Sequence, residues 1–307
     1  MTYNCIAVLG PTASGKTALA CGVAFHLDGE VISADSRQVY KHLDLGTGKD
    51  LQEYVIDGKI IPHHLIDVAE PGDQFYLHQF IAELEKSYRD ITARKKLPII
   101  CGGSGLYLDA LHKDFSLTAI KENETLRATL KHLEKQELLK KLEGYPKELT
   151  QQVDRSSSKR LLRGIEIAEH LQNFPNKVQH VTPAYKPYYL GINTDAEERK
   201  KKITQRLKKR MEEGLVKEVN HLLTMGISHE RLQHLGLEYK FVSLYLLHKI
   251  TRVELFDQLQ IAIFQFAKRQ MTWFRKMEKE GIEIHWLEPG MPIEQLANSL
   301  RKEFSVD

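Results

Sequence analysis

Apolar and polar positions alternate along the first third of the chain in a way that predicts strands followed by helices. A short apolar run at residues 5–9 ends at Gly10-Pro11, and a helix is expected from Lys16 to Leu27. The stretch "EVISADS" predicts a second strand that ends on Asp35, and "LPIICGGSG" predicts a third strand, after a helix with apolar positions from Leu77 to Ile91. This alternation is typical of an α/β fold with a parallel sheet and helices on both faces.

The pattern changes after about residue 112. Residues 113–185 are predicted to form a strongly charged helical insertion without a strand. A strand-like run returns in "KPYYLGINT", residues 186–194, and is followed by long helices through Glu280 and a short strand around "IEIHWLE". We therefore predict a catalytic core made of residues 1–112 and 186–307, interrupted by the helical insertion.

Composition narrows the class of protein without identifying it. The 307 residues are 42% hydrophobic and 28% charged, which is typical of a globular protein with a sizeable core. The formal net charge of +3 favours a nucleic-acid partner only if the basic residues gather on one surface. Three scattered cysteines suggest neither a disulfide framework nor a zinc site, so we expect a reducing cytoplasm. No stretch has the pattern of a secretory signal or a membrane span.

The stretch "GPTASGKT", residues 10–17, has the spacing of a phosphate-binding loop, or P-loop. Its glycines let backbone N–H groups surround an anion at a helix N-terminus, and Lys16 adds a mobile positive charge. The hydroxyl of Thr17 is the expected Mg²⁺ ligand. The loop does not specify its ligand, because a diphosphate ester presents the same oxygens as a nucleotide. The predicted phosphate-binding residues are Gly10, Pro11, Thr12, Ala13, Ser14, Gly15, Lys16 and Thr17.

Asp35 is the second informative residue. At the end of a strand, its carboxylate suits a base that takes a proton from a hydroxyl or an amine, but an aspartate there also suits a turn or a helix cap. The glycines at 102–105 allow close backbone approach, with one hydroxyl at Ser104. The ends of parallel strands meet at one edge, so we expect Gly10, Asp35 and Gly102 to converge. No acidic residue ends the third strand, which disfavours ATP hydrolysis.

Six segments carry a resemblance: "GPTASGKT", "DSRQVY", "PHHLID", "GGSGLYL", "KRLLRGIEI" and "AKRQMTWFR". In this order and spacing the chain resembles the tRNA dimethylallyltransferases, the bacterial tRNA isopentenyltransferase family, over essentially its whole length. The resemblance implies that the P-loop holds the diphosphate of dimethylallyl diphosphate. The prenyl group would go to the N6 amine of adenosine 37, beside the anticodon, in tRNAs that read codons starting with U, giving N6-isopentenyladenosine and diphosphate.

The resemblance also implies roles for particular residues. Asp35 matches the general base, Lys16 and Thr17 match the diphosphate and Mg²⁺ contacts, and Arg206 matches an arginine that assists the leaving diphosphate; Arg210 in the same charged run is the alternative. The family touches the tRNA anticodon stem-loop at the positions of Asp35, Ser36, Arg37, Gln38, Ser104, Arg127, Lys159, Arg160, Leu161, Leu162 and Arg163. "LGLEYK", residues 235–240, departs from the more usual Gly-Tyr-Lys/Arg of the family.

Three other functions fit parts of this pattern. A P-loop kinase for a small metabolite could use the same loop and Asp35. A prenyltransferase for free AMP could use them as well, but it has little need for a basic helical insertion. A non-catalytic RNA-binding protein is disfavoured because Lys16, Thr17 and Asp35 are all present. Nothing in the sequence demands a dimer, so we expect a monomer.

Overall fold

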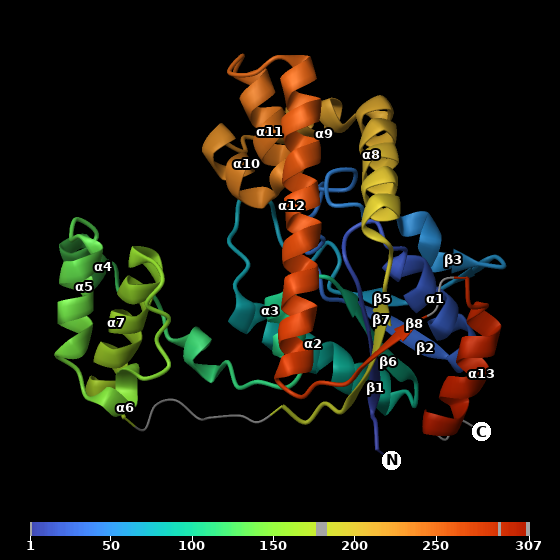
Figure 1. The fold of residues 1–307 in the computed structure, drawn as a ribbon, viewed down its shortest axis with the longest axis horizontal. Coiled ribbons are helices and arrows are strands. Elements are labelled where there is room, and N and C mark those ends of the chain that lie inside the picture. The colour runs from blue at the N-terminus through green and yellow to red at the C-terminus, as the bar shows by residue number, and fades with distance from the viewer. Residues whose placement is uncertain (1, 176–182, 288–289, 305–307) are drawn as a thin grey trace. The chain divides into compact units, whose positions relative to one another are not determined.

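The computed structural model describes residues 2–175, 183–287 and 290–304 (Figure 1). The chain divides into two compact units, one made of Met1–His112 and Ala184–Asp307 and the other of Lys113–Pro183. The first unit contains β1 (Cys5–Leu9), α1 (Lys16–Leu27), β2 (Gly29–Ser33), η1 (Leu51–Tyr54), β3 (Val55–Ile56), β4 (Lys59–Ile60), β5 (His63–His64), α2 (Leu77–Ala93), β6 (Leu97–Gly102), α3 (Gly105–Asp109), β7 (Pro187–Ile192), α8 (Ala196–Glu213), α9 (Leu215–Thr224), α10 (His229–Leu235), α11 (Leu237–Leu246), α12 (Arg252–Lys279), β8 (Ile284–Leu287) and α13 (Ile293–Phe304).

A six-stranded sheet with the order β5-β2-β6-β1-β7-β8 forms the centre of the first unit. Every neighbouring pair is parallel, with Val8 opposite Cys101 and Ile32 opposite Ile100. The α/β prediction is therefore confirmed. β1, β6 and β2 are adjacent, so their carboxyl ends lie side by side, as expected from the alternating pattern. β2 ends at Ser33 rather than at Asp35, because the chain turns there and the Arg37 N–H donates to Asp35 Oδ1.

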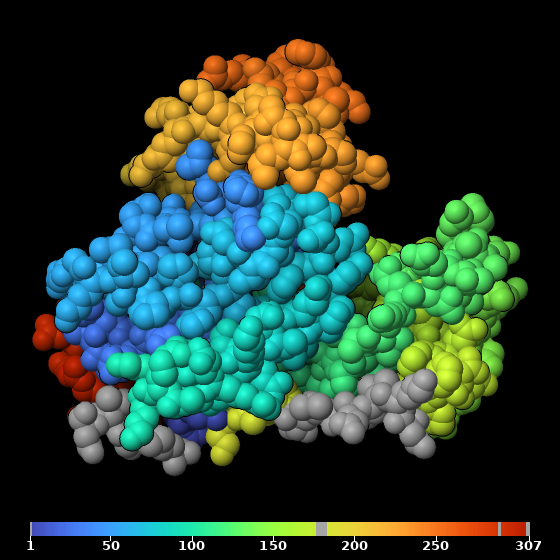
Figure 2. Space-filling model, turned by 180° about the vertical axis from the view of Figure 1, so that it is seen from behind, coloured from blue at the N-terminus to red at the C-terminus, as the bar shows by residue number. Residues whose placement is uncertain are grey.

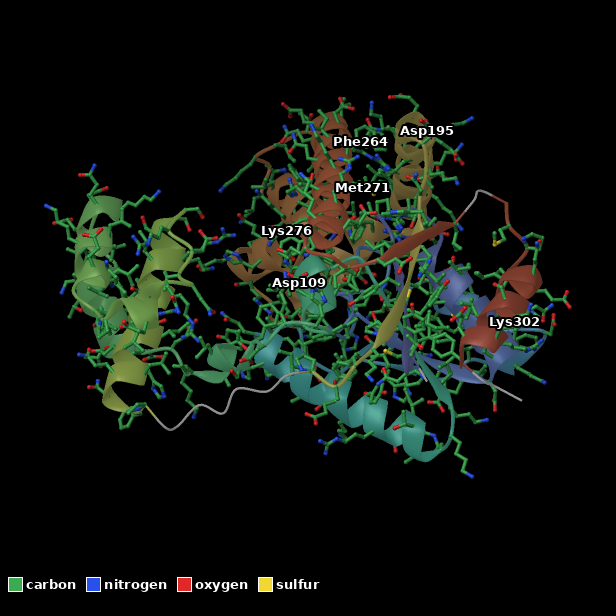
Figure 3. The ribbon with its side chains drawn as sticks, turned by 60° about the horizontal axis from the view of Figure 1, so that its bottom comes forward. Asp109, Asp195, Phe264, Met271, Lys276 and Lys302 are labelled. Atoms are coloured by element: carbon green, nitrogen blue, oxygen red, sulfur yellow. The ribbon has the colours of Figure 1, made fainter. Side chains whose placement is uncertain are left out.

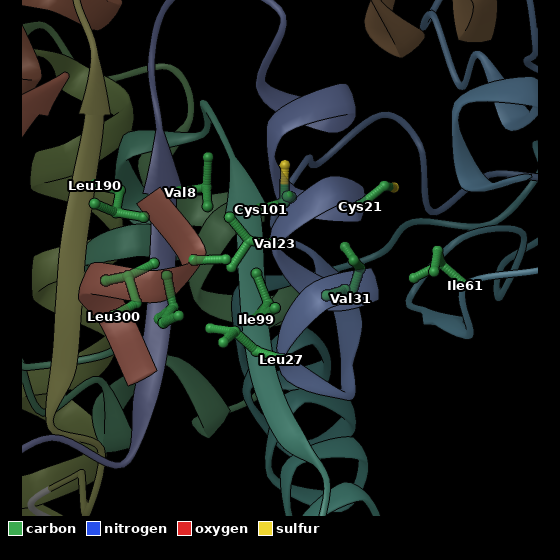
Figure 4. Close-up of a cluster of buried hydrophobic side chains, with 14 of the residues drawn as sticks. Val8, Cys21, Val23, Leu27, Val31, Ile61, Ile99, Cys101, Leu190 and Leu300 are labelled. Carbon is green, nitrogen blue, oxygen red and sulfur yellow. The ribbon is translucent and has the colours of Figure 1, made fainter. Parts of the chain in front are cut away.

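Buried side chains cover both faces of the sheet. On one face, Val8 of β1 and Ile99 of β6 pack against Val23 of α1 and Leu300 of α13 (Figure 4). The alternate residues of the same strands, such as Ala7 and Ile100, are also fully buried and belong to the opposite face. This double burial explains why the strands read as continuous apolar runs in the sequence.

The sequence pattern did not predict several short elements. β3 and β4 form a two-residue hairpin, and β5 adds a two-residue edge strand to β2. His64 Nε2 lies 2.8 Å from Glu30 Oε2, so His64 contributes to the packing of the edge strand β5 on β2. α13 was also not anticipated, although it packs on α1.

A second hydrophobic cluster joins α8, α9, α10, α11 and α12. At its centre, Tyr239 is fully buried and its hydroxyl donates to Glu218 Oε1 at 2.7 Å. The Glu218 carboxylate also accepts the backbone N–H groups of Asp44, Leu45 and Gly46. The helices thereby fix the loop that follows β2, which lies below them in blue in Figure 2.

The Lys113–Pro183 unit is helical, as its charged amphipathic pattern indicated. It contains η2 (Ser116–Ala119), α4 (Glu124–Leu130), α5 (Lys135–Glu143), α6 (Lys147–Thr150) and α7 (Ser158–Asn173), around a core of Leu130, Leu138, Leu142, Leu161 and Ile165. Residues 176–182 of the predicted insertion lie outside the described residues. No helix in the described part of the chain is both long enough and apolar enough to cross a membrane.

We predict that Gly102→Ala destabilises the first unit, because the added Cβ would lie 2.2 Å from the backbone oxygen of Ala34. Overpacking of this kind costs about 1–3 kcal/mol of unfolding free energy. Gly72→Ala is the matched control, since its Cβ would have no neighbour closer than 3.8 Å. Chemical denaturation of both variants measures the difference. Equal midpoints for the two variants would contradict the close approach of Gly102 to Ala34.

Candidate active site

A cavity of about 830 Å³ lies beyond the carboxyl ends of β1, β2 and β6. All of its walls belong to the first unit. The P-loop, residues 35–38 and residues 101–107 form the wall at the strand ends, and side chains of α8, α11 and α12 form the opposite wall. The segments that the sequence predicted to converge therefore line one cavity. The size is within the range of small-ligand sites in proteins.

The P-loop adopts a conformation that requires its glycines. Gly15 has φ of 86° at the start of α1, and a Cβ on Gly10 would lie 2.8 Å from Ser14 Oγ. That hydroxyl is buried and has no hydrogen-bond partner among the described residues. The Lys16 ammonium donates to the Pro11 carbonyl at 2.9 Å, and burial lowers the pKa of Lys16. The loop thus presents a hydroxyl and a desolvated lysine, which suit a phosphate ligand.

Two arginines of α8 line the cavity beside this loop. Arg206 donates from Nη2 to the Thr12 hydroxyl, so the structure brings it to the P-loop. Arg210 lies one helical turn further along α8. Burial lowers the pKa of Arg206 to about 10, and the positive charge of Arg210 adds to this effect. From the sequence, Arg206 and Arg210 were alternatives for the arginine that assists the leaving diphosphate. In the structure both line the cavity.

Asp35 and its neighbours form the part of the cavity wall after β2. Oδ1 of Asp35 accepts the Arg37 N–H at 2.8 Å, as a turn aspartate does, while the described chain provides no donor for Oδ2. The Ser36 N–H donates to Ser104 Oγ at 3.1 Å, which joins the loops after β2 and β6. Gln38 accepts from Ser33 Oγ and donates to the Gly48 carbonyl. Asp35 therefore combines a structural contact with one oxygen that can accept a proton.

Gln270 of α12 connects the P-loop to the end of β6, a contact that the sequence pattern did not predict. Its Oε1 accepts the Thr12 N–H at 2.8 Å, and its Nε2 donates to the Gly103 carbonyl at 2.9 Å. The side chain is buried. The only signal in the sequence was a polar residue on the apolar face of a long amphipathic helix, within "AKRQMTWFR".

The C-terminal half of α12 also closes the cavity next to α3. A Cβ on Gly105 would lie 2.3 Å from the ring of Trp273, so the indole packs directly on the backbone. The indole N–H donates to Asp109 Oδ1 at 3.1 Å, and Figure 3 shows Asp109 below the stretch of α12 that carries Met271 and Lys276. The motif "AKRQMTWFR" therefore lines the cavity with Trp273 and holds the P-loop in place through Gln270.

Two glutamates of the cavity were not anticipated. Glu53 of η1 lies beside Thr17 and the start of α1, and burial raises its pKa. Glu238 stands in the first turn of α11, close to Arg210 and Arg206, and burial also raises its pKa. Glu238 belongs to the unusual stretch "LGLEYK", whose Tyr239 anchors the Glu218 network. Neither glutamate carries a recognisable spacing signal, because both reach the site through loop and helix packing.

The residues present fit a Mg²⁺ ion that is shared with a phosphate ligand. The Thr17 hydroxyl and the Glu53 carboxylate offer oxygen donors, which Mg²⁺ prefers, and Mg²⁺ keeps several waters and substrate oxygens in such sites. No group of three or more His, Cys, Asp or Glu side chains suited to a metal occurs among the described residues.

The candidate tRNA-binding residues of the second unit have different surroundings within that unit. Lys159 and Arg160 are exposed, and Arg160 forms an ion pair with Asp154 at 2.5 Å. Leu161 is buried in the helical core, and Leu162 packs against it.

The remaining two basic candidates of this unit are held by internal contacts. Arg127 makes paired bonds to Glu166, and Arg163 donates to the Ile120 carbonyl at 2.5 Å.

Comparison with protein families agrees with this geometry. A family model described as IPP transferase matches residues 38–277, and one described as isopentenyl transferase matches residues 3–60. The chain belongs to the IPP transferase family. Within this family it is similar to tRNA dimethylallyltransferase 2 of Phocaeicola vulgatus, with 46% identity over 95% of this chain and 94% of the relative. It is 44% identical to tRNA dimethylallyltransferase 2 of Bacteroides fragilis, over 98% of each chain.

Solved structures of IPP transferases have the same fold. The chain is similar to the tRNA delta(2)-isopentenylpyrophosphate transferase of Staphylococcus epidermidis, with a TM-score of 0.67, 32% identity and 98% coverage of both chains. The full-length tRNA isopentenylpyrophosphate transferase of Bacillus halodurans gives a TM-score of 0.70 at 28% identity, over 99% of this chain and 97% of that one.

We predict that Gln270→Ala loosens the P-loop, since it leaves the Thr12 N–H and the Gly103 carbonyl without their partner. Loss of a partner for a buried polar group costs about 1–3 kcal/mol. Hydrogen–deuterium exchange of the peptide that contains residues 10–17 should accelerate in this variant. Gln265→Ala, an exposed change on the same helix, should leave that exchange unchanged. Slow exchange in both variants would show that Gln270 does not hold the loop.

Proposed function

We propose that this chain transfers the dimethylallyl group of dimethylallyl diphosphate to the N6 amine of adenosine 37 in tRNAs that read codons starting with U. The products are N6-isopentenyladenosine and diphosphate. Family membership supports prenyl transfer to tRNA, because relatives that match almost the whole chain are named tRNA dimethylallyltransferases. The observation that carries the chemistry is one cavity that contains both a P-loop and an aspartate with a free carboxylate oxygen.

The cationic side of the cavity serves the leaving group. Backbone N–H groups of the P-loop, Lys16 and Arg206 stabilise the negative charge that develops on the diphosphate as its bond to carbon breaks. Preorganised charges of this kind act more strongly where burial desolvates them, as it does for Lys16 and Arg206. Thr17, with Glu53 beside it, would hold a Mg²⁺ ion that, when bound, supplies further positive charge for the departing oxygens. The hydrogen bonds of Lys16 to the Pro11 carbonyl and of Arg206 to the Thr12 hydroxyl hold both cations beside the P-loop. There they can orient the diphosphate.

The carboxylate side serves the nucleophile. Asp35 takes a proton from the N6 amine on Oδ2 while the nitrogen forms its bond to the prenyl carbon and the carbon–oxygen bond breaks. The electron pair of that bond leaves with the diphosphate. General-base catalysis of this kind contributes about 10²–10⁴-fold to the rate. The bond between Asp35 Oδ1 and the Arg37 N–H keeps the carboxylate in place.

An adenine that reaches this cavity must leave the stack of the anticodon loop, so we propose a flipped base. Residues 35–38 and Ser104 line the cavity and are proposed to contact the flipped nucleotide and its neighbours. In the second unit, the exposed Lys159 and Arg160 are proposed to bind tRNA phosphates.

We assign a supporting role to the other candidates of the second unit. Leu161, Leu162, Arg163 and Arg127 would shape the helix that presents these two basic residues, because their side chains are used within the unit.

Two alternatives share the P-loop and Asp35. A small-metabolite kinase would move a phosphoryl group, and a prenyltransferase for free AMP would not need the Lys113–Pro183 unit. The names of the relatives favour tRNA as acceptor.

We further propose that the protein is a monomer and that it acts on folded tRNA in the cytoplasm.

We predict that purified protein with Mg²⁺ and dimethylallyl diphosphate forms N6-isopentenyladenosine in unmodified tRNA that carries A36 and A37. Asp35→Asn should lower kcat by about 10²–10⁴-fold, because the amide cannot accept the proton. Mass spectrometry of nuclease digests measures the product, and the same tRNA with G37 is the negative control. Transfer of label from ATP to a small acceptor, with tRNA unmodified, would overturn the assignment.

We predict that diphosphate binding takes up protons at alkaline pH. Burial lowers the pKa of Lys16 in the free protein, so the lysine loses its proton at a lower pH than an ordinary lysine. A bound anion favours the charged form, so binding raises this pKa, and affinity weakens as pH rises through the free-protein value. Calorimetry in buffers of different ionisation enthalpy measures the uptake. At a pH below the Arg206 pKa of about 10, Lys16→Met should abolish this uptake. Uptake that persists in this variant at that pH would assign the proton to another group.

A further inference from the structure

The guanidinium of Arg210 is unusual among the cations of the cavity. The residue is only 5% exposed, yet it lines the cavity, and its Nη2 has no hydrogen-bond partner among the described residues. Asp50 Oδ2 lies 3.6 Å from Nη2, which is ion-pair distance and too far for a hydrogen bond. A buried charged donor without a hydrogen bond is costly, so Nη2 can gain free energy from a further acceptor.

The loop after β2 is shaped around this guanidinium. Gly48 has φ of 65°, and a Cβ there would lie 1.9 Å from Arg210 Nη2. The positive φ favours glycine at this position, and a side chain there would displace the guanidinium. The Gly48 carbonyl accepts a hydrogen bond from Gln38 Nε2 at 3.0 Å, which holds the loop against the end of β2. The position of the guanidinium is thus built into the cavity wall.

Arg210 also stands next to a second arginine of the same helix. Arg206, four residues earlier, donates to the Thr12 hydroxyl of the P-loop. The helical rise between the two residues is about 6 Å, so they can engage different phosphate groups of one ligand. The pKa of Arg206 is lowered by burial and then by the charge of Arg210. Glu238 lies close to both arginines, but burial raises its pKa and weakens it as a compensating anion.

We propose that Arg210 binds oxygens of the second phosphate of the prenyl diphosphate, the phosphate that the P-loop and Arg206 do not hold. The site then distinguishes a diphosphate from a single phosphate. This inference rests on the proposed function, and it adds a specificity-determining residue to that site. The unusual Glu238 offsets part of the charge of two neighbouring guanidiniums when no ligand is bound.

Binding of two simple anions tests the inference. Isothermal titration calorimetry with inorganic pyrophosphate and with inorganic phosphate compares the wild-type protein, Arg210→Met and Lys208→Met. Lys208 is exposed on the same helix and is the matched control for the lost charge. Arg210→Met should weaken pyrophosphate binding about 10- to 100-fold, the loss expected for a charged hydrogen-bonding partner. Phosphate binding should stay within about twofold, since one phosphate needs only the P-loop and Arg206.

A second variant and a second ligand isolate the contribution of Arg210 to diphosphate binding. Arg210→Lys keeps the charge but loses the paired donors, so it should show a smaller loss of pyrophosphate affinity, and it serves if the Met variant does not fold. Equal pyrophosphate affinities for the wild-type protein and the Arg210 and Lys208 variants would overturn the proposed role of Arg210. This result would leave the proposed function unaffected. A loss of tRNA affinity in filter binding, with pyrophosphate affinity intact, would also overturn that role of Arg210. A wild-type protein that binds no pyrophosphate would contradict the proposed function itself.

Discussion

The adjacent carboxyl ends of β1, β2 and β6 are the constraint on which the active site depends. A parallel sheet places the P-loop, Asp35 and the glycines after β6 at one edge, although 93 residues separate Gly10 from Gly103. The backbones come so close that a Cβ on Gly102 would meet Ala34, and one on Gly103 would meet Gln270. α12 stabilises this edge, because the Gln270 side chain forms hydrogen bonds with both the P-loop and the residue that follows β6. The P-loop and Asp35 therefore line one cavity, which is the arrangement that the proposed reaction needs.

The charges of this cavity suit a ligand that brings several negative charges. Lys16, Arg206 and Arg210 are desolvated and close together, and burial lowers the pKa of both Lys16 and Arg206. Buried cations of this kind are unfavourable in an empty site and favourable around an anion. The two hydrophobic clusters of the first unit, one on the sheet and one among α8 to α12, hold the segments that carry these cations. The cavity thus suits a ligand on which negative charge increases, as the proposed reaction requires of its diphosphate.

The sequence predicted the parts of the fold that carry a strong local signal. Continuous apolar runs and glycine loops predicted the strands β1, β6, β7 and β8 and the helix Lys16–Leu27. Amphipathic, strongly charged periodicity predicted the change to a helical segment after residue 112. β3, β4 and β5 have two residues each, too few for any periodicity. Gln270, Glu53 and Arg210 reach the cavity through packing of segments distant from the P-loop, so their roles have no local signature. Arg210 was considered only as a substitute for Arg206.

The central claim is that the P-loop holds a leaving diphosphate, so that carbon moves and phosphorus does not. The most direct measurement uses dimethylallyl diphosphate labelled with ¹⁴C in the prenyl group and ³²P in the diphosphate, incubated with the protein and unmodified tRNA. The account predicts ¹⁴C in the tRNA and ³²P in free diphosphate, in equal amounts. Appearance of ³²P in the tRNA, or release of diphosphate without ¹⁴C transfer, would contradict it.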